Sequence, residues 1–254
     1  MTPVLSLKGV EKSFDATRAV DGLTFDVAPG EMFGVIGPDG AGKTTTLRMM
    51  CGLVRPDAGE VRLFGADPFR ARSTSVTSIG YVPQRFSLYG DLSIDENIAF
   101  FARLHGVSQF ADRRTRLLTM TGLLPFRDRL ANKLSGGMKQ KLALACTLVH
   151  EPKLLILDEP TTGVDPVSRR EFWKLLTEFR SQGLTAVLAT PYLDEAERCD
   201  RVALLREGRV LALDTPDALR QMDHAVILEV IASPPRKALR VLREQLGEIG
   251  RAHV

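Results

Sequence analysis

The eight residues Gly37–Thr44, GPDGAGKT, constrain the fold of this chain more than any other stretch. They fit the pattern GxxxxGK[ST] and stand between a compact apolar run, Met32–Ile36, and an expected helix over Lys43–Cys51. In that context the glycines let backbone N–H groups curl around an anion, and the helix N-terminus adds its positive end. The sequence therefore predicts a phosphate-binding loop formed by Gly37, Pro38, Asp39, Gly40, Ala41, Gly42, Lys43, Thr44 and Thr45. Lys43 is expected to reach the β- and γ-phosphates of a nucleotide, and Thr44 to bind Mg²⁺.

A second motif, LLILDEP over Leu154–Pro160, is an apolar strand that delivers two acids at its end. Asp158 is placed to hold the metal ion, as the equivalent aspartate does in phosphate-loop enzymes. Glu159 is expected to project toward the water that attacks the γ-phosphate and to act as general base. The alternative is an acidic exit from a strand at the surface. The phosphate-binding loop favours the catalytic interpretation.

Strands alternate with helices along most of the chain, which predicts an α/β fold with a parallel sheet. The middle third, about residues 93–149, changes to helices, beginning with Ser93 as N-cap and Glu96 at capping-box spacing. We expect a separate helical lobe there. Further helices are predicted at about Pro166–Arg180 and at Pro216–Met222. Besides the two apolar runs above, strands are predicted at Leu5–Val10, Leu23–Val27, Glu60–Phe64, Ile79–Val82 and Thr185–Ala189.

The pattern restarts after Met222, so we expect one domain over residues 1–222 and a small strand–helix extension over 223–254. The extension reads as an incomplete subdomain, with a flexible tail as the alternative.

Composition excludes several classes of protein. A net charge of +3 over 254 residues, with both signs interspersed, does not favour nucleic acid as a partner. The three cysteines lie far apart, so neither a disulfide framework nor a zinc site is indicated. No apolar run approaches the roughly 18 to 20 residues of a membrane helix, and the N-terminus lacks the apolar core of a signal peptide. We expect a cytosolic protein whose membrane role, if it has one, comes through a partner.

The segment LSGGMKQK, Leu134–Lys141, joins a serine N-cap and two glycines to a helix. A serine hydroxyl and unpaired N–H groups at a helix N-terminus bind phosphate well. By spacing alone, an ordinary capped helix explains the segment equally.

Four segments in order, GPDGAGKTT, YVPQ, LSGGMKQ and LLILDEPTTGVD, resemble the ATP-binding cassette family over roughly Val4–Pro216. The resemblance implies an α/β phosphate-loop NTPase core with a mixed or parallel sheet, an antiparallel β subdomain and a helical subdomain. It implies ATP and Mg²⁺ as cofactors and ATP hydrolysis coupled to transport.

The resemblance also implies a head-to-tail dimer of cassettes. Each ATP would lie between the phosphate loop of one subunit and the LSGGM segment of the other, with Ser135, Gly136 and Gly137 near the γ-phosphate. Asp165 matches the aspartate that runs across the dimer interface.

Two further residues take roles from the same resemblance. Gln84 matches the glutamine that touches Mg²⁺ and the attacking water and senses the membrane partner. Phe14 falls where family members place an aromatic ring on adenine, and a core phenylalanine at a strand end is the alternative.

Within the family, PQRFSLYGDLSIDENIAFFARLHG and EPTTGVDPVSRREFW look most like cassettes of bacterial drug exporters. This likeness implies a separate transmembrane permease, contacted near Gln84 to Phe101, and a place on the inner face of the cell membrane. The aromatics after Gln84 fit such a contact, while an amphipathic core is the simpler explanation for most of them; they are Phe86, Tyr89, Phe100 and Phe101.

Two residues depart from the family pattern. Asp39 stands where asparagine is usual and brings a carboxylate near phosphates; we expect a modest weakening of binding, with the side chain pointing outward. Pro191 stands where the family has a histidine that bonds the γ-phosphate and holds the attacking water. Proline has neither a side-chain donor nor a backbone N–H, so hydrolysis is expected to be weakened.

Two functions follow. The first is an ATPase subunit that powers an exporter, paired with an identical, a different or a fused second cassette. The second is a degenerate ATP-binding half of a pair, although the intact Glu159 argues against it. A cassette of translation or DNA repair is a third class, but the chain has neither two phosphate loops nor a long coiled coil.

Overall fold

The structure is a computed structural model that describes residues 2–70, 78–85 and 88–222. Contacts divide the chain into Met1–Arg220 and Gln221–Val254. Of the second unit, only Gln221 and Met222, at the end of helix α8 (Pro216–Met222), are described. The extension predicted over residues 223–254 therefore lies outside the described residues.

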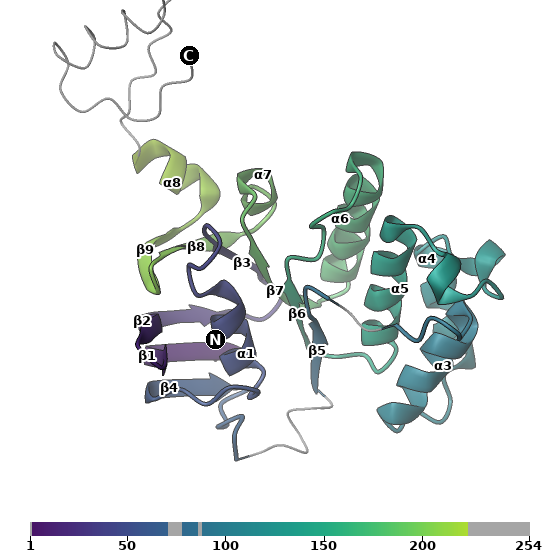
Figure 1. Cartoon of the computed structure of the whole chain (residues 1–254), viewed down its shortest axis with the longest axis horizontal. Helices are drawn as coiled ribbons and strands as arrows, with labels where there is room; N and C mark the ends of the chain where they lie inside the picture. Colours follow the sequence, from purple (N-terminus) through teal and green to yellow (C-terminus); the bar gives the residue numbers. More distant parts are fainter. Residues whose placement is uncertain (1, 71–77, 86–87, 223–254) are drawn as a thin grey trace, which may run out of the picture. The chain divides into compact units, whose positions relative to one another are not determined.

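A six-stranded sheet forms the centre of the first unit (Figure 1). Neighbouring strands are parallel, except that the last pair is antiparallel. The strands, in spatial order, are β5 (Ile79–Val82), β6 (Leu154–Asp158), β7 (Thr185–Thr190), β3 (Met32–Ile36), β8 (Arg201–Arg206) and β9 (Arg209–Asp214).

Strands β6, β7 and β3 of this sheet are buried at every position. Within β6, Leu155 and Leu157 belong to one hydrophobic core, and Leu154 and Ile156 belong to the other. Strands buried on both faces read as continuous apolar runs rather than as an alternating pattern. That is why LLILD and MFGVI stand out in the sequence.

An antiparallel sheet of β2 (Thr17–Val27), β1 (Leu5–Phe14) and β4 (Ala58–Leu63) is stacked beside α1 (Lys43–Met50). Leu47, Met49 and Met50 of α1 share a core with residues of both sheets. The phosphate-loop core, the mixed sheet and the antiparallel subdomain that the resemblance implies are thus confirmed.

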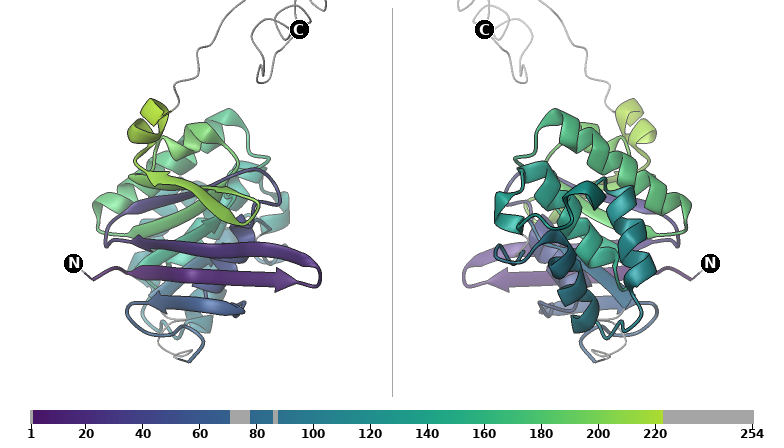
Figure 2. Two further views of the ribbon diagram at one scale, coloured as in Figure 1. Left: turned by 90° about the vertical axis from the view of Figure 1, so that its left-hand side faces the viewer. Right: turned by 90° about the vertical axis from the view of Figure 1, so that its right-hand side faces the viewer.

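Helices cover the other face of the large sheet, and Figure 2 shows them from that side. They include α3 (Ile94–Leu104), α4 (Ala111–Met120), α5 (Gly136–Leu148) and α6 (Pro166–Ser181), with short 3₁₀ turns at Leu124–Phe126 and Ala131–Lys133. The predicted capping box is present, because Ser93 and Glu96 each bind the backbone N–H of the other. Within the described part of the chain, no helix is long and apolar enough to cross a bilayer.

The largest difference from the predicted elements is the hairpin β8–β9, which the sequence analysis missed. Its strands carry arginines at both ends of β8 and at the start of β9, and every residue of β9 keeps some exposure to solvent. The turn Glu207-Gly208 has φ of 51° and 77°, as a two-residue hairpin turn requires. Likewise, β1 and β2 run further toward their shared turn than predicted, with Asp15 at φ 50° inside it.

The parallel register brings four strand ends to one edge of the sheet. Asp158 pairs with Ala189, Ile36 with Thr190, and Val82 with Leu157. The residues that follow these strands, among them Gly37, Glu159 and Pro191, therefore emerge side by side. Ligands of open α/β sheets bind at this edge.

Two histidine rings lie at the junction between the helices and β5. His105 and His150 stack with ring centroids 3.8 Å apart and planes 7° apart. Nε2 of His150 donates to the carbonyl of Ile79, 3.1 Å away, while its buried Nδ1 has no partner in the described residues. Burial, then the neighbouring His105 and the charge of Arg113, lowers the pKa of His150 to about 4, although the bond to Ile79 opposes this.

This histidine makes the fold sensitive to acid. A folded-state pKa below the model-peptide value of 6.5 means that the unfolded chain binds more protons between those two values, so stability falls as pH drops through that window. We expect wild type to lose about 1 kcal/mol more unfolding free energy between pH 7 and pH 5 than His150→Gln, after allowing for the partial exposure of the ring. Urea unfolding at both pH values measures this, and equal losses in the two proteins would contradict it.

Candidate functional site

The loop from Gly37 to Gly42 joins β3 to α1 and has no space for side chains at two positions. A Cβ on Gly37 would lie 2.3 Å from the carbonyl oxygen of Leu205, and one on Gly42 would lie 2.3 Å from that of Ala19. Gly42 also has φ of 97°, which favours glycine. Glycine at these two positions therefore lets the loop pack directly against the backbone of β8 and β2.

Lys43 begins α1 and folds back beneath the loop. Its side chain is only 4% exposed, and its Nζ donates to the carbonyls of Gly37 at 2.9 Å and Pro38 at 3.1 Å. The carboxylate of Asp39 lies 3.9 Å from Nζ and its side chain is 94% exposed, so it points outward as the sequence analysis expected. The ammonium is thus held at the loop in position for an anion.

Asp158, the last residue of β6, accepts a hydrogen bond from Thr44 Oγ1 at 3.1 Å. Burial raises the pKa of this carboxyl, and the Thr44 bond acts in the opposite direction. Tyr81 OH lies 3.5 Å from the other oxygen, and burial, with Asp158 as the second cause, raises the pKa of that phenol to about 12. A hydroxyl and a carboxylate side by side are the oxygen donors that Mg²⁺ prefers.

In the described part of the chain, no three His, Cys, Asp or Glu side chains gather into a cluster that could hold a metal ion.

Glu159 lies at the centre of the arrangement. One carboxylate oxygen is 3.3 Å from Lys43 Nζ, and the other accepts from Gln84 Nε2 at 3.1 Å and from Thr162 Oγ1 at 3.2 Å. Its φ of 49° is unusual for a residue that is not glycine, and its backbone N–H is bonded to Ala189 O. The structure thus brings Lys43, Gln84 and Glu159, three predicted site residues, into contact, with Lys43 and Glu159 buried and Gln84 exposed.

A pocket of about 520 Å³ opens over this cluster. It contains eight of the predicted residues: Asp39, Gly40, Gly42, Lys43, Thr44, Thr45, Gln84 and Glu159. Pro191 lines it too, as do three residues that the sequence analysis missed: Ala19, Thr162 and Tyr192. Thr162 follows Glu159 by three residues, and Tyr192 is the second residue after the end of β7. The rule that strand ends gather at one edge of the sheet could therefore have found both.

The remaining predicted site residues do not line this pocket. Ser135 is the N-cap of α5 and accepts from Met138 N, and Asp165 is the N-cap of α6 and accepts from Val167 N and Ser168 N. The hydrogen bond from Ser168 N is the main reason that the pKa of Asp165 is lowered. Those outside the pocket lining are Phe14, Gly37, Pro38, Ala41, Ser135, Gly136, Gly137, Asp158 and Asp165.

The two helix N-termini meet at Gly137, where a Cβ would lie 2.2 Å from Ser168 Oγ. Ser135 and Gly136 are exposed there. Within one chain, the LSGGM segment is therefore a capped helix N-terminus whose first residues are exposed to solvent.

Phe14 ends β1 with 47% of its surface exposed, so the alternative of a core phenylalanine is wrong. The Nζ of Lys12 lies 5.4 Å from the ring centroid. An exposed ring at a strand end is available to stack on a ligand.

The aromatic cluster after Gln84 is partly surface and partly core. Tyr89 lies 4.5 Å from Phe100 and 6.4 Å from Phe101 between ring centroids. Tyr89 is exposed, whereas Phe101 packs against the hydrophobic core. Phe86 lies outside the described residues.

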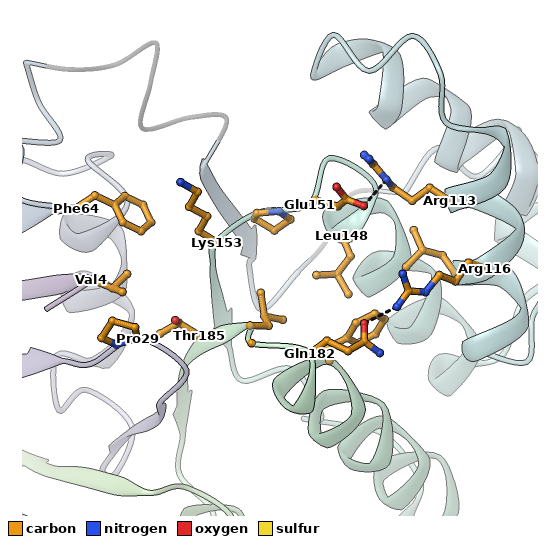
Figure 3. A pocket seen from close by; sticks show the side chains of 15 residues that line it. Val4, Pro29, Phe64, Arg113, Arg116, Leu148, Glu151, Lys153, Gln182 and Thr185 are labelled. Carbon is orange, nitrogen blue, oxygen red and sulfur yellow. Dashed lines mark hydrogen bonds and ion pairs between the residues drawn. The ribbon is translucent and has the colours of Figure 1, made fainter. Parts of the chain in front are cut away.

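A second pocket, of about 580 Å³, lies near the amino ends of β6 and β7 (Figure 3). Its lining is mostly apolar. Both of its arginines have partners: Arg113 pairs with Glu151 at 2.8 Å, and Arg116 donates to Gln182 at 2.6 Å. Its chemistry does not match that of a phosphate site.

Comparisons with known proteins agree with this geometry. A family profile described as ABC transporter matches residues 20–162. The chain is 49% identical over 222 residues to the "Probable multidrug ABC transporter ATP-binding protein YbhF" of Escherichia coli (strain K12), covering 86% of this chain but only 38% of that protein. It is 43% identical over 234 residues to the "Nod factor export ATP-binding protein I" of Paraburkholderia xenovorans (strain LB400), covering 91% and 77%.

Solved structures show the same likeness. The chain superposes with a TM-score of 0.78 and 32% identity on an ATP binding subunit of an ABC transporter, covering 86% of this chain and 92% of that one. It superposes with a TM-score of 0.79 and 28% identity on cbiO1 of Clostridium perfringens, part of the ABC transporter complex cbiONQ.

Replacing Lys43 tests the phosphate loop. Lys43→Ala removes the buried ammonium, and hydrogen bonds to charged groups contribute about 1.5–3 kcal/mol. We expect ATP affinity to fall on the order of 10- to 100-fold in isothermal titration calorimetry. Lys174→Ala, an exposed lysine on α6, is the matched control and should bind as wild type does. Affinity of Lys43→Ala within twofold of wild type would exclude the loop as the phosphate site.

Proposed function

We infer the function from one premise: this chain belongs to the ABC transporter family, as one of its ATP-binding domains. The ATP-binding domains of this family are ATPases. We propose that this chain binds ATP with Mg²⁺ and hydrolyses it to power an exporter. The observation that carries the proposal is that the buried Glu159 contacts both the buried Lys43 and Gln84.

Each residue of the cluster has a proposed role. Lys43 binds the β- and γ-phosphates together with the N–H groups of the loop. Thr44 and Asp158, already joined by a hydrogen bond, hold Mg²⁺ with Gln84. Glu159 accepts a proton from the attacking water, and such positioned bases typically contribute about 10²–10⁴-fold to rate. Phe14 stacks on adenine, and its exposure supports this role.

The site is completed by a second cassette. Ser135, Gly136 and Gly137 form an open helix N-terminus outside the pocket of their own chain. We propose that they bind the γ-phosphate held by a partner cassette, and that Asp165 crosses the same interface. The partner is an identical chain, a different chain or a fused second cassette.

A separate transmembrane permease supplies the membrane part. We propose that it docks near Gln84 to Phe101, where the exposed Tyr89 belongs to the aromatic cluster. The chain would then lie in the cytoplasm, on the inner face of the cell membrane. The names of the relatives, which refer to multidrug transport and Nod factor export, support an exporter.

Pro191 supports a second candidate function. It lines the nucleotide pocket without any hydrogen-bond donor. We propose that hydrolysis is weakened for this reason. In the alternative, the chain is the degenerate half of a pair that binds ATP and regulates a competent partner. The intact Glu159, with its contacts to Lys43 and Gln84, favours the ATPase.

Glu159→Gln tests the dimer. The amide keeps the shape of the side chain but cannot accept the proton, so ATP should remain bound and hold two cassettes together. Light scattering should show an ATP-dependent dimer in this variant. Glu178→Gln, on the exposed face of α6, should behave as wild type. If Glu159→Gln stays monomeric with ATP, the chain does not form the proposed sandwich with itself.

Pro191→His tests the weakened site. An imidazole at the pocket wall supplies the missing donor, so phosphate release by the isolated protein should rise several-fold if both sites of a homodimer carry the defect. The exposed Pro125→His is the control. No rise in isolation, with normal activity only beside a partner cassette, would support the paired alternative. Fast hydrolysis by wild type that Pro191→His leaves unchanged would show that Pro191 does not limit the rate.

A further inference from the structure

The segment that follows β7 forms one wall of the nucleotide pocket and offers few hydrogen-bond donors. Thr190 is fully buried and does not line the pocket. Pro191 has no N–H, and the N–H of Tyr192 already donates to Thr190 Oγ1 at 3.1 Å. The phenol hydroxyl of Tyr192 is therefore the donor that this segment can still offer to a ligand.

Tyr192 belongs to the lining of the same pocket as Lys43, Glu159 and Thr162, and the residue is 37% exposed. Its hydroxyl makes no hydrogen bond to any residue that the structure describes. A tyrosine ring at a pocket wall with an unpaired hydroxyl is available for a phosphate oxygen, which accepts strongly from O–H donors.

A buried network holds the ring in place. The Arg169 guanidinium lies over the ring of Tyr192, 4.7 Å from Cζ to the centroid. Arg169 is itself fixed, because its Nε donates to Glu195 at 2.8 Å and its Nη2 to Asp194 at 2.9 Å.

The same network reaches the catalytic turn. Glu195 is only 1% exposed and accepts from Trp173 Nε1 at 3.4 Å and from the hydroxyl of Thr161. Thr161 follows Glu159 by two residues. One buried carboxylate thus ties the guanidinium that covers Tyr192 to the turn that carries Glu159, so the two sides of the pocket are held relative to each other.

We propose that the hydroxyl of Tyr192 donates a hydrogen bond to the γ-phosphate of bound ATP, in place of the side-chain donor that Pro191 lacks. This inference rests on the proposed function, since it assigns a contact within the same ATP site. Under this proposal, a cassette with proline at this position still hydrolyses ATP, because the neutral phenol of Tyr192 supplies a hydrogen bond. The rate is lower than that of a site with a histidine.

The decisive experiment measures binding rather than turnover. In a Glu159→Gln background, which does not consume ATP, Tyr192→Phe deletes only the hydroxyl. A hydrogen bond to a charged group is worth roughly 13- to 160-fold in affinity, so ATP affinity should fall about tenfold or more while ADP affinity stays unchanged. Thr119→Val, which removes an exposed hydroxyl on α4, is the control and should alter neither.

Three results separate the possibilities. An ATP affinity that Tyr192→Phe leaves unchanged would overturn the assignment of Tyr192, while the proposed function would stand. Failure of the unmodified chain to bind either nucleotide would overturn the proposed function and this inference with it. Equal weakening of ATP and ADP would also overturn the assignment, because ADP has no γ-phosphate for the hydroxyl to contact.

Turnover gives an independent check. With Glu159 intact, Tyr192→Phe should lower kcat for phosphate release about tenfold. This is less than the roughly 10²–10³-fold typical of a donor in a water-excluded site, because Tyr192 is 37% exposed to solvent. In a Pro191→His background the imidazole supplies its own donor, so the same substitution should cost less than threefold. A full tenfold loss in that background would overturn the idea that the phenol stands in for the missing side chain.

Discussion

A buried lysine and a buried glutamate, Lys43 and Glu159, lie 3.3 Å apart at the carboxyl ends of β3 and β6. Neither charge could remain there alone, because an unpaired ion in a protein interior carries a large desolvation cost. The loop carbonyls of Gly37 and Pro38 bind the ammonium, and Gln84 and Thr162 bind the carboxylate. The phosphate loop, the end of β6 and the segment after β5 are therefore fixed by one set of contacts.

The two-sided burial of the central sheet makes this cluster possible. Side chains of β6 alternate between a core shared with α1 and a core shared with the helices on the far face. A one-residue slip of a strand held between two cores would send each side chain into the opposite core, where the close-packed space has another shape. The register that sets Asp158 beside Ala189, and Ile36 beside Thr190, is thereby fixed, and with it the wall formed by Pro191 and Tyr192.

The arrangement divides the proposed chemistry between two surfaces. Lys43, Thr44 and Glu159 converge in a pocket, whereas Ser135 and Asp165 cap two helices that meet at Gly137 and Ser168. Ser135 and Gly136 are exposed at the N-terminus of α5. Such a helix end can donate hydrogen bonds to an anion that is bound by another chain. Dependence of hydrolysis on a second cassette, as proposed, follows from this separation.

The sequence by itself determined the elements whose signals are local. The glycine pattern required a loop between strand and helix, continuous apolar runs identified the buried strands, and Ser93 with Glu96 marked the start of α3. The hairpin β8–β9 escaped because its strands are half-exposed and edged with arginines, although its Glu207-Gly208 turn was a usable signal.

Only the tertiary structure decided which distant residues meet. No local pattern shows that Gln84 and Thr162 bind the same carboxylate, that Phe14 is exposed, or that Tyr192 is covered by Arg169. Those contacts depend on strand order and register, which arise from packing two cores against one sheet. A sequence motif specifies backbone shape over a few residues, whereas a contact such as that between Gln84 and Glu159, 75 residues apart, is set by how the whole chain buries its apolar surface.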